Sequence, residues 1–379
     1  MAYYSIFPEK DSTIYSNPDR DTLNTGNDEI LELVKEKGST NNIYYPTRIL
    51  IQFKDSEISD TLSNKITGNF SASLQLFSIE HKNLAQNQNI EVFPLSQSWD
   101  EGTGRFSNLP SSSNGCSWLY SDNSTTKTEW ITTGFAPGTT GSILSGIGLT
   151  QGGGVWYTGS AFSSSQEFSN SEILDLNLDV TNIVQKFSAS IIANNSYPDG
   201  IPNNGFLIKY SDSIEIDTSS SKGELNYFSV DTHTIFPPKL TFKWDDSVHN
   251  LQSSAKTSGE LNVSLYRNKE EYNINEEATF RLNVRDKYPN RTFVTSSNYL
   301  NPGYFTTSSF YSIRDAHTEE VIIPFDDNFT KLSADENGMY FKLFINGLQP
   351  ERYYRILLKH INNEGIEIFD NNYHFKVVR

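Results

Sequence analysis

The segment Met339-Tyr-Phe-Lys-Leu-Phe-Ile345 places an apolar residue at every second position. A period of two puts these side chains on one face of an extended strand, which predicts a strand with one buried face. The same alternation recurs in four other segments, at residues 49–53, 72–76, 240–244 and 280–284. Many such strands predict an all-β protein whose sheets are packed on one side.

Asn-Gly pairs between these segments can supply the positive φ angles that tight turns need. They occur at Asn114-Gly115, Asn204-Gly205, Asn337-Gly338 and Asn346-Gly347. One helix is predicted, over residues 179–187, because its apolar residues fall on a single helical stripe. Those residues are Val180, Ile183, Val184 and Phe187. Many strands joined by turns are typical of β-sandwiches or barrels.

The 379 residues are enough for two or three domains, each with a core of its own. All five tryptophans precede residue 246, at Trp99, Trp118, Trp130, Trp156 and Trp244. Residues 246–260 are polar, which indicates a linker. We therefore predict a first domain at 1–245, a linker at 246–260 and a second domain at 261–379.

Within the first domain, residues 107–170 are rich in Ser, Gly, Thr and Asn, with isolated aromatic residues. This composition predicts a long, exposed insertion between strands. Two interpretations stay open, because long insertions often contact a partner but can also be solvent-exposed flaps.

The formal net charge of −16 and the pI near 4.8 describe an acidic surface. Such a surface repels phosphate backbones and anionic lipids, so we expect neither nucleic acid nor a membrane as a partner. The first residues lack the pattern of a signal peptide, and no window approaches a membrane-spanning run of about 20 apolar residues. The single cysteine, Cys116, excludes an internal disulfide and is predicted to be a buried residue rather than a nucleophile.

Motifs of common catalytic sites are missing from the sequence, including the nucleophile elbow, the P-loop, the zinc-protease helix motif and the dinucleotide fingerprint. We therefore predict a non-enzyme with no catalytic residues and no organic cofactor. Asp100 and Glu101, beside Trp99, could serve a glycosidase, which needs two carboxylates. Neighbouring strand residues point to opposite faces, however, so this pair is predicted to lie in a turn.

Calcium is a weaker possibility, because it prefers six to eight oxygen ligands. The candidate carboxylates are Asp11, Asp28, Asp326 and Asp335. Asp326-Asp327-Asn328 and Asp335-Glu336-Asn337-Gly338 match a calcium loop only in part, because the full spacing and the closing glutamate are absent. Ordinary turn acids are the other interpretation of all four.

Residues 5–244 contain, in order, a series of short motifs. They are Asp11-Ser-Thr-Ile-Tyr-Ser-Asn-Pro, Asn24-Thr-Gly-Asn-Asp-Glu-Ile-Leu-Glu-Leu33, Arg48-Ile-Leu-Ile-Gln-Phe53, Ala72-Ser-Leu-Gln-Leu76, Trp99-Asp-Glu-Gly-Thr103, Leu178-Asp-Val-Thr-Asn-Ile-Val184 and Asn204-Gly-Phe-Leu-Ile-Lys209. Together they resemble the DNRLRE-type modules. That resemblance implies a jelly-roll-like, non-catalytic β-sandwich, some members of which attach proteins to glycans or surfaces. The insertion at 107–170 departs from the compact pattern of those modules.

The C-terminal residues resemble fibronectin type III and immunoglobulin-like domains. Leu348, Pro350, Tyr354, Ile356, Leu358 and Gly365 match the end of that pattern. In it, Leu348 fills the core and the Tyr354 hydroxyl bonds back across the corner between two strands. The tryptophan usual in type III domains is missing, so the resemblance implies an Ig-like β-sandwich.

The whole chain is also similar to virion structural proteins of T4-like marine bacteriophages. The segments that carry this similarity are Tyr311-Ser-Ile-Arg-Asp-Ala-His-Thr-Glu-Glu320 and Asn371-Asn-Tyr-His-Phe-Lys-Val-Val-Arg379. The similarity implies a location in the virion after assembly in the host cytoplasm. The expected partners are copies of the chain itself and other proteins of the tail, baseplate, neck or fibre attachment.

Two further functions remain open. A virion-displayed module could bind host glycans, with Trp118, Trp130 and Trp156 as the stacking or partner-contact residues. Exposed rings would favour that function and buried rings would remove its main support. A polysaccharide hydrolase built on Asp100 and Glu101 is the other alternative.

Overall fold

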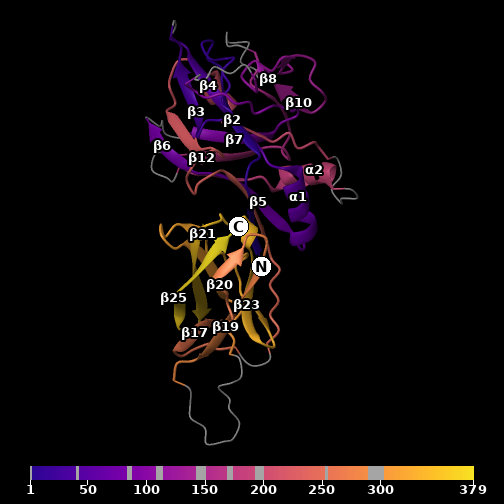
Figure 1. The fold of residues 1–379 in the computed structure, drawn as a ribbon. Helices are drawn as coiled ribbons and strands as arrows, with labels where there is room; N and C mark the ends of the chain where they lie inside the picture. The colour runs from indigo at the N-terminus through magenta and orange to yellow at the C-terminus, as the bar shows by residue number, and fades with distance from the viewer. Residues whose placement is uncertain are drawn as a thin grey trace, which may run out of the picture. The chain divides into compact units, whose positions relative to one another are not determined.

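The computed structural model describes residues 2–39, 42–82, 88–107, 114–141, 151–168, 174–192, 200–251, 255–288 and 303–379. The chain divides into two compact units, whose elements are labelled in Figure 1. The N-terminal unit comprises Ile6–Lys65 and Ser71–Thr241. The C-terminal unit comprises Phe242–Arg379 and two short segments, Met1–Ser5 and Ile66–Phe70. The main division thus falls between Thr241 and Phe242, and two segments from earlier in the sequence belong to the C-terminal unit.

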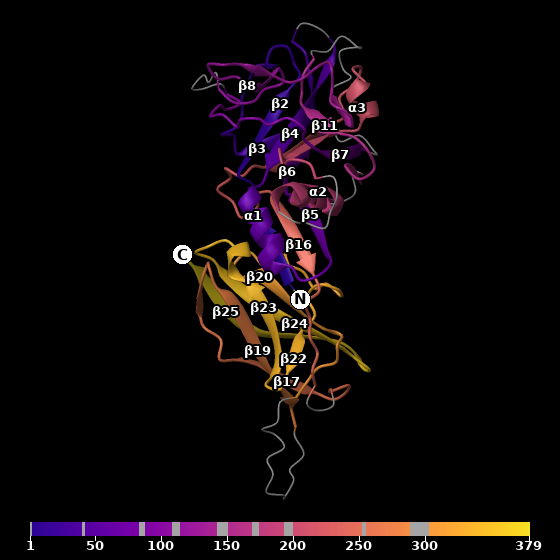
Figure 2. The same ribbon diagram turned by 90° about the vertical axis from the view of Figure 1, so that its right-hand side faces the viewer.

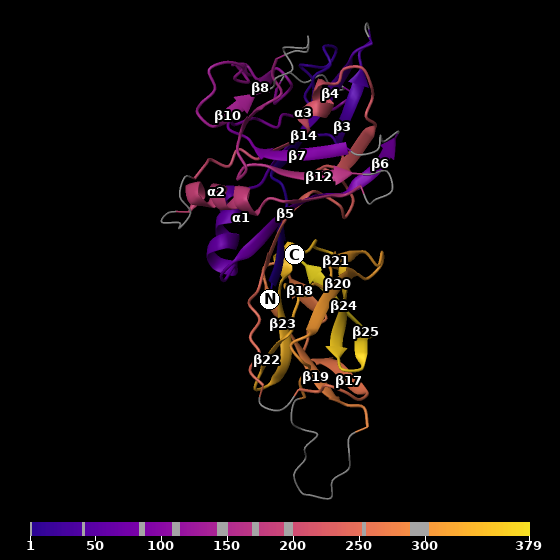
Figure 3. The ribbon, with the colours of Figure 1, turned by 180° about the vertical axis from the view of Figure 1, so that it is seen from behind.

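Two β-sheets form the C-terminal unit (Figures 2 and 3). One sheet has the order β17 (Leu261–Tyr266), β19 (Glu277–Asp286), β23 (Gly338–Phe344) and β22 (Ser333–Asp335). The other has the order β18 (Glu271–Asn273), β25 (Gly365–Val378), β24 (Tyr353–Asn362), β20 (Ser309–Asp315) and β21 (Val321–Ile323). This strand arrangement is that of an immunoglobulin-like sandwich, as predicted.

The strands of this sandwich show the alternation on which the prediction rested. In β19 and β23, every second side chain is buried. Phe341 lies at the centre of the core, with its ring stacked on Phe280 at 4.9 Å and on Tyr311 at 4.3 Å between centroids. Leu348 is buried in the same core. The short turn η4 (Ile345–Gly347) precedes it, so Asn346-Gly347 belongs to a 3₁₀ turn.

The predicted corner is also present. The Tyr354 hydroxyl donates to the carbonyl oxygen of Gln349 over 2.9 Å. Tyr354 is buried, so this bond satisfies a hydroxyl group that water does not reach.

Replacing Tyr354 by phenylalanine is expected to lower the free energy of unfolding of the C-terminal unit by about 1 kcal/mol, because the Gln349 carbonyl loses its donor. Urea denaturation followed by circular dichroism measures the change. Tyr353→Phe is the matched control, since Tyr353 is 45% exposed. Equal effects of the two substitutions would show that the corner bond contributes nothing.

A strongly curled antiparallel sheet dominates the N-terminal unit. Its strands follow the order β12 (Ser164–Phe168), β7 (Gln88–Pro94), β14 (Phe206–Tyr210), β4 (Tyr44–Gln52), β3 (Ile30–Lys37), β15 (Glu224–Phe228) and β6 (Ser78–Lys82), and β2 (Lys10–Tyr15) also pairs with β4. A further strand, β5 (Phe70–Leu76), pairs with β13 (Leu176–Asp179). The predicted all-β class is therefore confirmed.

The remaining elements are short. Two small hairpins join β8 (Tyr120–Asp122) to β9 (Thr128–Glu129) and β10 (Thr139–Gly141) to β11 (Val155–Tyr157). The helices are α1 (Asp55–Asp60), which continues as the π-helical turn η1 (Thr61–Lys65), α2 (Thr181–Ile191) and α3 (Asp212–Ile216). The chain passes from one unit to the other after Ser5 in β1 (Ala2–Ile6), after Lys65, after Phe70, and after Thr241 in β16 (Lys239–Trp244). None of the helices among the described residues is long and apolar enough to cross a membrane.

The predicted helix is confirmed as α2, which buries Ile183, Val184 and Phe187. Strand β4 departs from the prediction of a single buried face, because Ile49, Leu50 and Ile51 are all fully buried. Both faces of this central strand are covered, as is usual where a sheet lies between two layers.

Residues 246–260 depart from the predicted linker, because their described part is paired within the C-terminal unit. His249 forms a parallel bridge with Ala334 of β22, and the Asn250 amide donates to the Ala334 carbonyl over 2.9 Å. The Lys256 amide donates to the Tyr304 carbonyl over 2.7 Å. Backbone groups of this segment therefore form hydrogen bonds within the C-terminal unit.

The predicted insertion at 107–170 is likewise not a free flap in its described part. Its last strand, β12, pairs with β7 from Ser164 to Phe168 and forms one edge of the large sheet. The described residues before β12 include the two small hairpins.

Candidate functional site

The three tryptophans predicted to bind glycans are buried. Trp118 is 0% exposed, Trp130 is 1% exposed and Trp156 is 5% exposed. The guanidinium of Arg48 lies 4.8 Å from the Trp118 ring centroid and 5.1 Å from that of Trp156. Rings held in this core present no stacking face to a sugar, so the main support for glycan binding by these three residues is removed.

Two of these rings, Trp118 and Trp156, cover the buried side chain of Arg48. Its side chain leaves β4 on the face opposite Ile49 and donates to both carboxylate oxygens of Glu215, over 2.9 and 2.7 Å. It also donates to the carbonyl of Gly153 over 2.6 Å. Lys209 adds a second cation, 3.6 Å from Glu215. Buried charges need such partners, and the indole rings screen this group from water.

Two of the motifs that resemble DNRLRE-type modules meet in space. The Asn24 side chain donates to the carbonyls of Glu101 and Cys116 over 2.6 and 2.9 Å, and accepts from the Gly104 amide over 2.7 Å. A Cβ atom on Gly26 would lie only 2.2 Å from the Glu101 carbonyl oxygen. The Asn-Thr-Gly and Trp-Asp-Glu-Gly-Thr motifs therefore lock two loops together. Cys116 is buried there as predicted.

Asp100 and Glu101 do not share a site. Glu101 turns toward β2, where its carboxylate accepts from the Asp11 amide over 3.0 Å. Asp11 is itself buried, and its carboxylate accepts from the Val230 amide over 2.7 Å. Burial raises the pKa of Asp11 well above its usual range, and it raises the pKa of Glu101 from 4.5 to about 7. Asp231 and Asp100 also face Glu101, and Lys10 opposes them.

The N-terminal unit is expected to lose stability as the pH rises from about 4.5 to about 7. In this range Glu101 still holds its proton in the folded state, whereas the exposed glutamate of the unfolded state has released it. The unfolded state therefore binds fewer protons, and the free energy of unfolding falls as the pH rises. Glu101→Gln should raise the stability at pH 8 by about 1–2 kcal/mol, after allowance for screening by water, and flatten this slope. Thermal unfolding at several pH values measures both effects. An unchanged slope in the variant would contradict this assignment.

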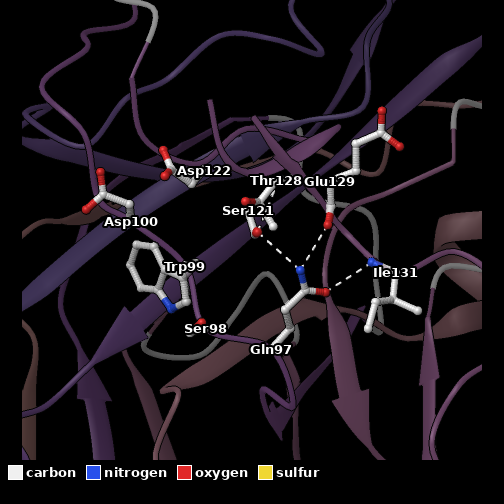
Figure 4. A pocket seen from close by; sticks show the side chains of 9 residues that line it. All are labelled: Gln97, Ser98, Trp99, Asp100, Ser121, Asp122, Thr128, Glu129 and Ile131. Carbon is white, nitrogen blue, oxygen red and sulfur yellow. Dashed lines mark hydrogen bonds between the residues drawn. The ribbon is translucent and has the colours of Figure 1, made fainter. Parts of the chain in front are cut away.

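A surface pocket lies beside this acid pair, with a volume of about 600 Å³ (Figure 4). Residues before, within and directly after the β8–β9 hairpin line it: Gln97, Ser98, Trp99, Asp100, Ser121, Asp122, Thr128, Glu129 and Ile131. Three of these nine residues are carboxylates, and none is a lysine, arginine or histidine. The pocket is therefore acidic, and it is the candidate functional site.

Gln97 shapes this pocket. Its amide nitrogen donates to the Ser121 hydroxyl over 3.2 Å and to the Glu129 carbonyl over 2.9 Å, and its amide oxygen accepts from the Ile131 amide over 3.0 Å. These bonds, drawn in Figure 4, attach the segment before Trp99 to both strands of the hairpin. Trp99 is held by a bond from its indole nitrogen to the Asn204 carbonyl over 2.9 Å.

The three carboxylates differ in how they are held. Asp122 accepts from the amide and the hydroxyl of Ser124, each over 2.8 Å. Asp100 and Glu129 accept no side-chain hydrogen bond from the described residues, although Lys10 attracts Asp100 through space. Sequence reasoning noticed Asp100 but missed Gln97, Asp122 and Glu129, because no motif marks them and only the hairpin brings them together.

The calcium candidates do not converge. Asp11 and Asp28 hold the backbone amides of Val230 and Phe106. Asp326 accepts from the amides that follow it in its own turn. Asp335 is bound by both terminal nitrogens of Arg281, over 2.9 and 2.8 Å. No group of three acids, histidines or cysteines suited to a metal occurs among the described residues.

Comparisons with known proteins identify no family. No family model matches the chain, and no curated protein matches it. A DUF4785 family protein from Legionella pneumophila is similar at 8% identity and a TM-score of 0.17, over 100% of this chain and 68% of that one. A beta-glucuronidase from Parabacteroides merdae reaches 8% identity and 0.16, over 96% of this chain and 35% of that one. Likenesses at these scores carry no argument about fold or function.

Proposed function

We propose that this chain is a non-catalytic structural protein of a bacteriophage particle, in the tail, baseplate, neck or fibre attachment, and that it acts by packing against neighbouring subunits. The sequence resemblances described above suggest the particle. One structural observation supports the packing role, and it lies on the outer face of the β24–β25 hairpin.

Ile366 and Ile368 of β25 are 66% and 58% exposed. They are two residues apart, so they lie on the same face of the strand. The pairing with β24 places Ile361 opposite Ile366 and Lys359 opposite Ile368. We call Ile361, Ile366 and Ile368 the isoleucine patch. Clustered apolar side chains on a folded surface typically mark contact with another protein, and the occupant proposed here is a neighbouring protein subunit of the particle.

Purified particles of the phage that encodes the chain provide the test. Mass spectrometry is expected to detect the chain in particles, and a cryo-EM reconstruction is expected to place it in fixed, symmetric copies. In that density, the isoleucine patch should be covered by a neighbouring subunit. Absence of the chain from intact particles would refute the proposal.

The double variant Ile366→Ser/Ile368→Ser is expected to enter particles at least about tenfold less well, because the interface loses two buried apolar side chains. Quantitative mass spectrometry of particles from a complemented deletion strain measures this. Val321→Ser is the matched control, because Val321 is 42% exposed but lies on strand β21, outside the patch. Equal incorporation of both variants would show that the isoleucine patch is not part of the interface.

Binding of host glycans remains the second candidate. The buried tryptophans no longer support it, but the polar lining of the pocket beside Trp99 does, because carboxylates and hydroxyls can bond sugar hydroxyls. A glycan array probed with the full chain tests this function directly.

A further inference from the structure

We propose that His360 is an acid-sensitive switch, which holds the β24–β25 hairpin and its isoleucine patch in place at neutral pH and releases them in acid. This inference rests on the proposed function, since it adds regulation to the surface proposed to contact a neighbouring subunit. It follows from the burial of the ring, its hydrogen bonds, the charges that face it and its position beneath the patch.

The ring of His360 belongs to the core of the C-terminal unit. Its side chain is 0% exposed, and it stacks on Phe305 with 4.3 Å between ring centroids. Phe305 in turn stacks on Phe369 of β25 at 5.6 Å. A charged imidazolium in this place loses its hydration, whereas the neutral ring keeps its stacking at no such cost. Burial accordingly lowers the pKa of His360 from 6.5 to about 4.

The hydrogen bonds around the ring also require the neutral form. The Thr306 amide donates to Nε2 over 3.5 Å, so Nε2 is an acceptor. The Thr306 hydroxyl lies 3.4 Å from Nε2 and donates to the Ile361 carbonyl over 3.2 Å. The neutral ring therefore carries its proton on Nδ1. A second proton, on Nε2, would face the amide hydrogen of Thr306 and break this contact.

One carboxylate attracts a protonated ring, but weakly. Glu367 lies opposite His360 in the strand pair, and its Oε2 is 3.9 Å from Nδ1. That distance is too long for a hydrogen bond, and Nδ1 has no hydrogen-bond partner among the described residues. The Glu367 side chain is 36% exposed, so water screens its charge, and it already accepts from the Asn362 amide nitrogen over 3.3 Å.

The other elements around the ring bring no further compensation. Lys359 precedes His360 on β24 and is bonded to Asp327 over 3.2 Å. Lys256, whose backbone amide donates to the Tyr304 carbonyl, pairs with Asp286 over 2.8 Å. The residues that meet His360 from the segment before β24 are uncharged, namely Phe305, Thr306 and Ser309. Protonation would therefore bury a charge with little to balance it.

His360 lies beneath the isoleucine patch. In the pairing of β24 with β25, the pair of His360 and Glu367 stands between the pair of Ile361 and Ile366 and the position of Ile368. Alternate residues of a strand point to opposite faces, so the ring faces the core while the patch faces outward. The turn that joins the two strands is close by, so this end of the hairpin can open without unfolding the whole sandwich.

The hairpin is therefore expected to open more often as the pH falls from about 6.5 to about 4. In this range the ring of the open form takes up a proton and the ring of the closed form does not, so acid favours the open form. Between pH 7 and pH 5, the ratio of open to closed hairpin should rise about twentyfold. The isoleucine patch then loses the conformation that a neighbouring subunit contacts.

Hydrogen–deuterium exchange of the isolated full chain measures this opening. Mass spectrometry gives protection factors, which allow for the ordinary effect of pH on exchange. Peptides that cover residues 357–370 are expected to lose protection about twentyfold between pH 7 and pH 5, while peptides from β19 keep theirs. An unchanged hairpin, or an equal loss in β19, would overturn the proposal.

Variants assign the response to the ring. His360→Gln is expected to abolish it, because the glutamine oxygen can accept from the Thr306 amide but takes up no proton. His374→Gln is the matched control, since His374 is exposed on β25, and it should respond as the unaltered chain does. Glu367→Gln should also keep the response. The proposal fails if the response survives in His360→Gln or disappears in Glu367→Gln.

A second measurement uses the unaltered chain and so does not depend on the folding of any variant. The ring signals of His360, identified by their NOEs to the Thr306 amide, are followed by NMR during a pH titration. They should titrate with a pKa of about 4. Titration near the ordinary value of 6.5 would show that the ring does not oppose its own protonation, and the switch would be excluded.

The two proposals can fail separately. If particles contain the chain but the hairpin keeps its protection in acid, the switch fails and the structural function stands. If the hairpin opens in acid but particles lack the chain, the structural function fails and the acid response of His360 remains.

Discussion

Replacing Glu215 by glutamine is expected to lower the free energy of unfolding of the N-terminal unit by about 3–5 kcal/mol. The substitution keeps the size of the side chain, so it leaves no cavity. It removes a carboxylate that accepts from Nε and from one terminal nitrogen of Arg48, and both of these side chains are 1% exposed. Arg48 would keep its bond to Gly153, but its buried charge would lose the Glu215 carboxylate that opposes it.

The measurement is urea denaturation followed by tryptophan fluorescence. Four of the five tryptophans belong to the N-terminal unit, and two of them flank Arg48. Glu36→Gln is the matched control, because its partner Arg20 is 36% exposed and such a surface pair contributes less than about 1 kcal/mol. If the two variants lose the same stability, the buried pair is not a main support of this fold.

A second experiment separates the charge from the packing. The double variant Arg48→Met/Glu215→Leu removes both charges together and should recover much of the lost stability, because apolar replacements of buried ion pairs are often neutral or stabilising. A double variant as unstable as Glu215→Gln would show that the hydrogen bonds to Gly153 and the indole contacts matter more than the unpaired charge.

Phe341→Ala is expected to destabilise the C-terminal unit by about 3–5 kcal/mol. The ring lies between Phe280 and Tyr311 in a closely packed aromatic core, so its loss leaves a cavity that rigid neighbours cannot fill. Circular dichroism during denaturation measures the change. Lys342→Ala on the next residue is the control, because Lys342 is exposed and its pair with Glu277 lies at the surface. A loss below about 1 kcal/mol for Phe341→Ala would mean that the core collapses around the gap.

Much of the fold was predictable because it follows from local patterns. The alternation around Phe280 and Phe341, the stripe of α2 and the Tyr354 corner each lie within a few residues of sequence. Local patterns specify which face of an element is apolar. They predicted that β19 and β23 each bury one face, whereas the Ig-like arrangement of the two sheets was implied by the family resemblance.

The errors came from contacts between distant residues. Arg48 and Glu215 are 167 positions apart, and Trp118 and Trp156 are buried in the core that covers this pair. Without knowledge of this contact, the Ser- and Gly-rich composition of residues 107–170 led to the prediction of an exposed segment. The pocket has the same origin, because Gln97 meets Glu129 through a hairpin whose second strand has only two residues.

The composition of the C-terminal unit has a consequence for protein synthesis. Tyr3 belongs to the aromatic core of that unit, and the rings of Tyr4 and Phe344 form a T-shaped pair with 5.9 Å between centroids. Translation proceeds from the N-terminus, so Tyr3 and Tyr4 leave the ribosome long before strand β23 exists. They must wait for their partners while the whole N-terminal unit is made. The C-terminal unit is therefore completed by residues that emerge before the N-terminal unit does.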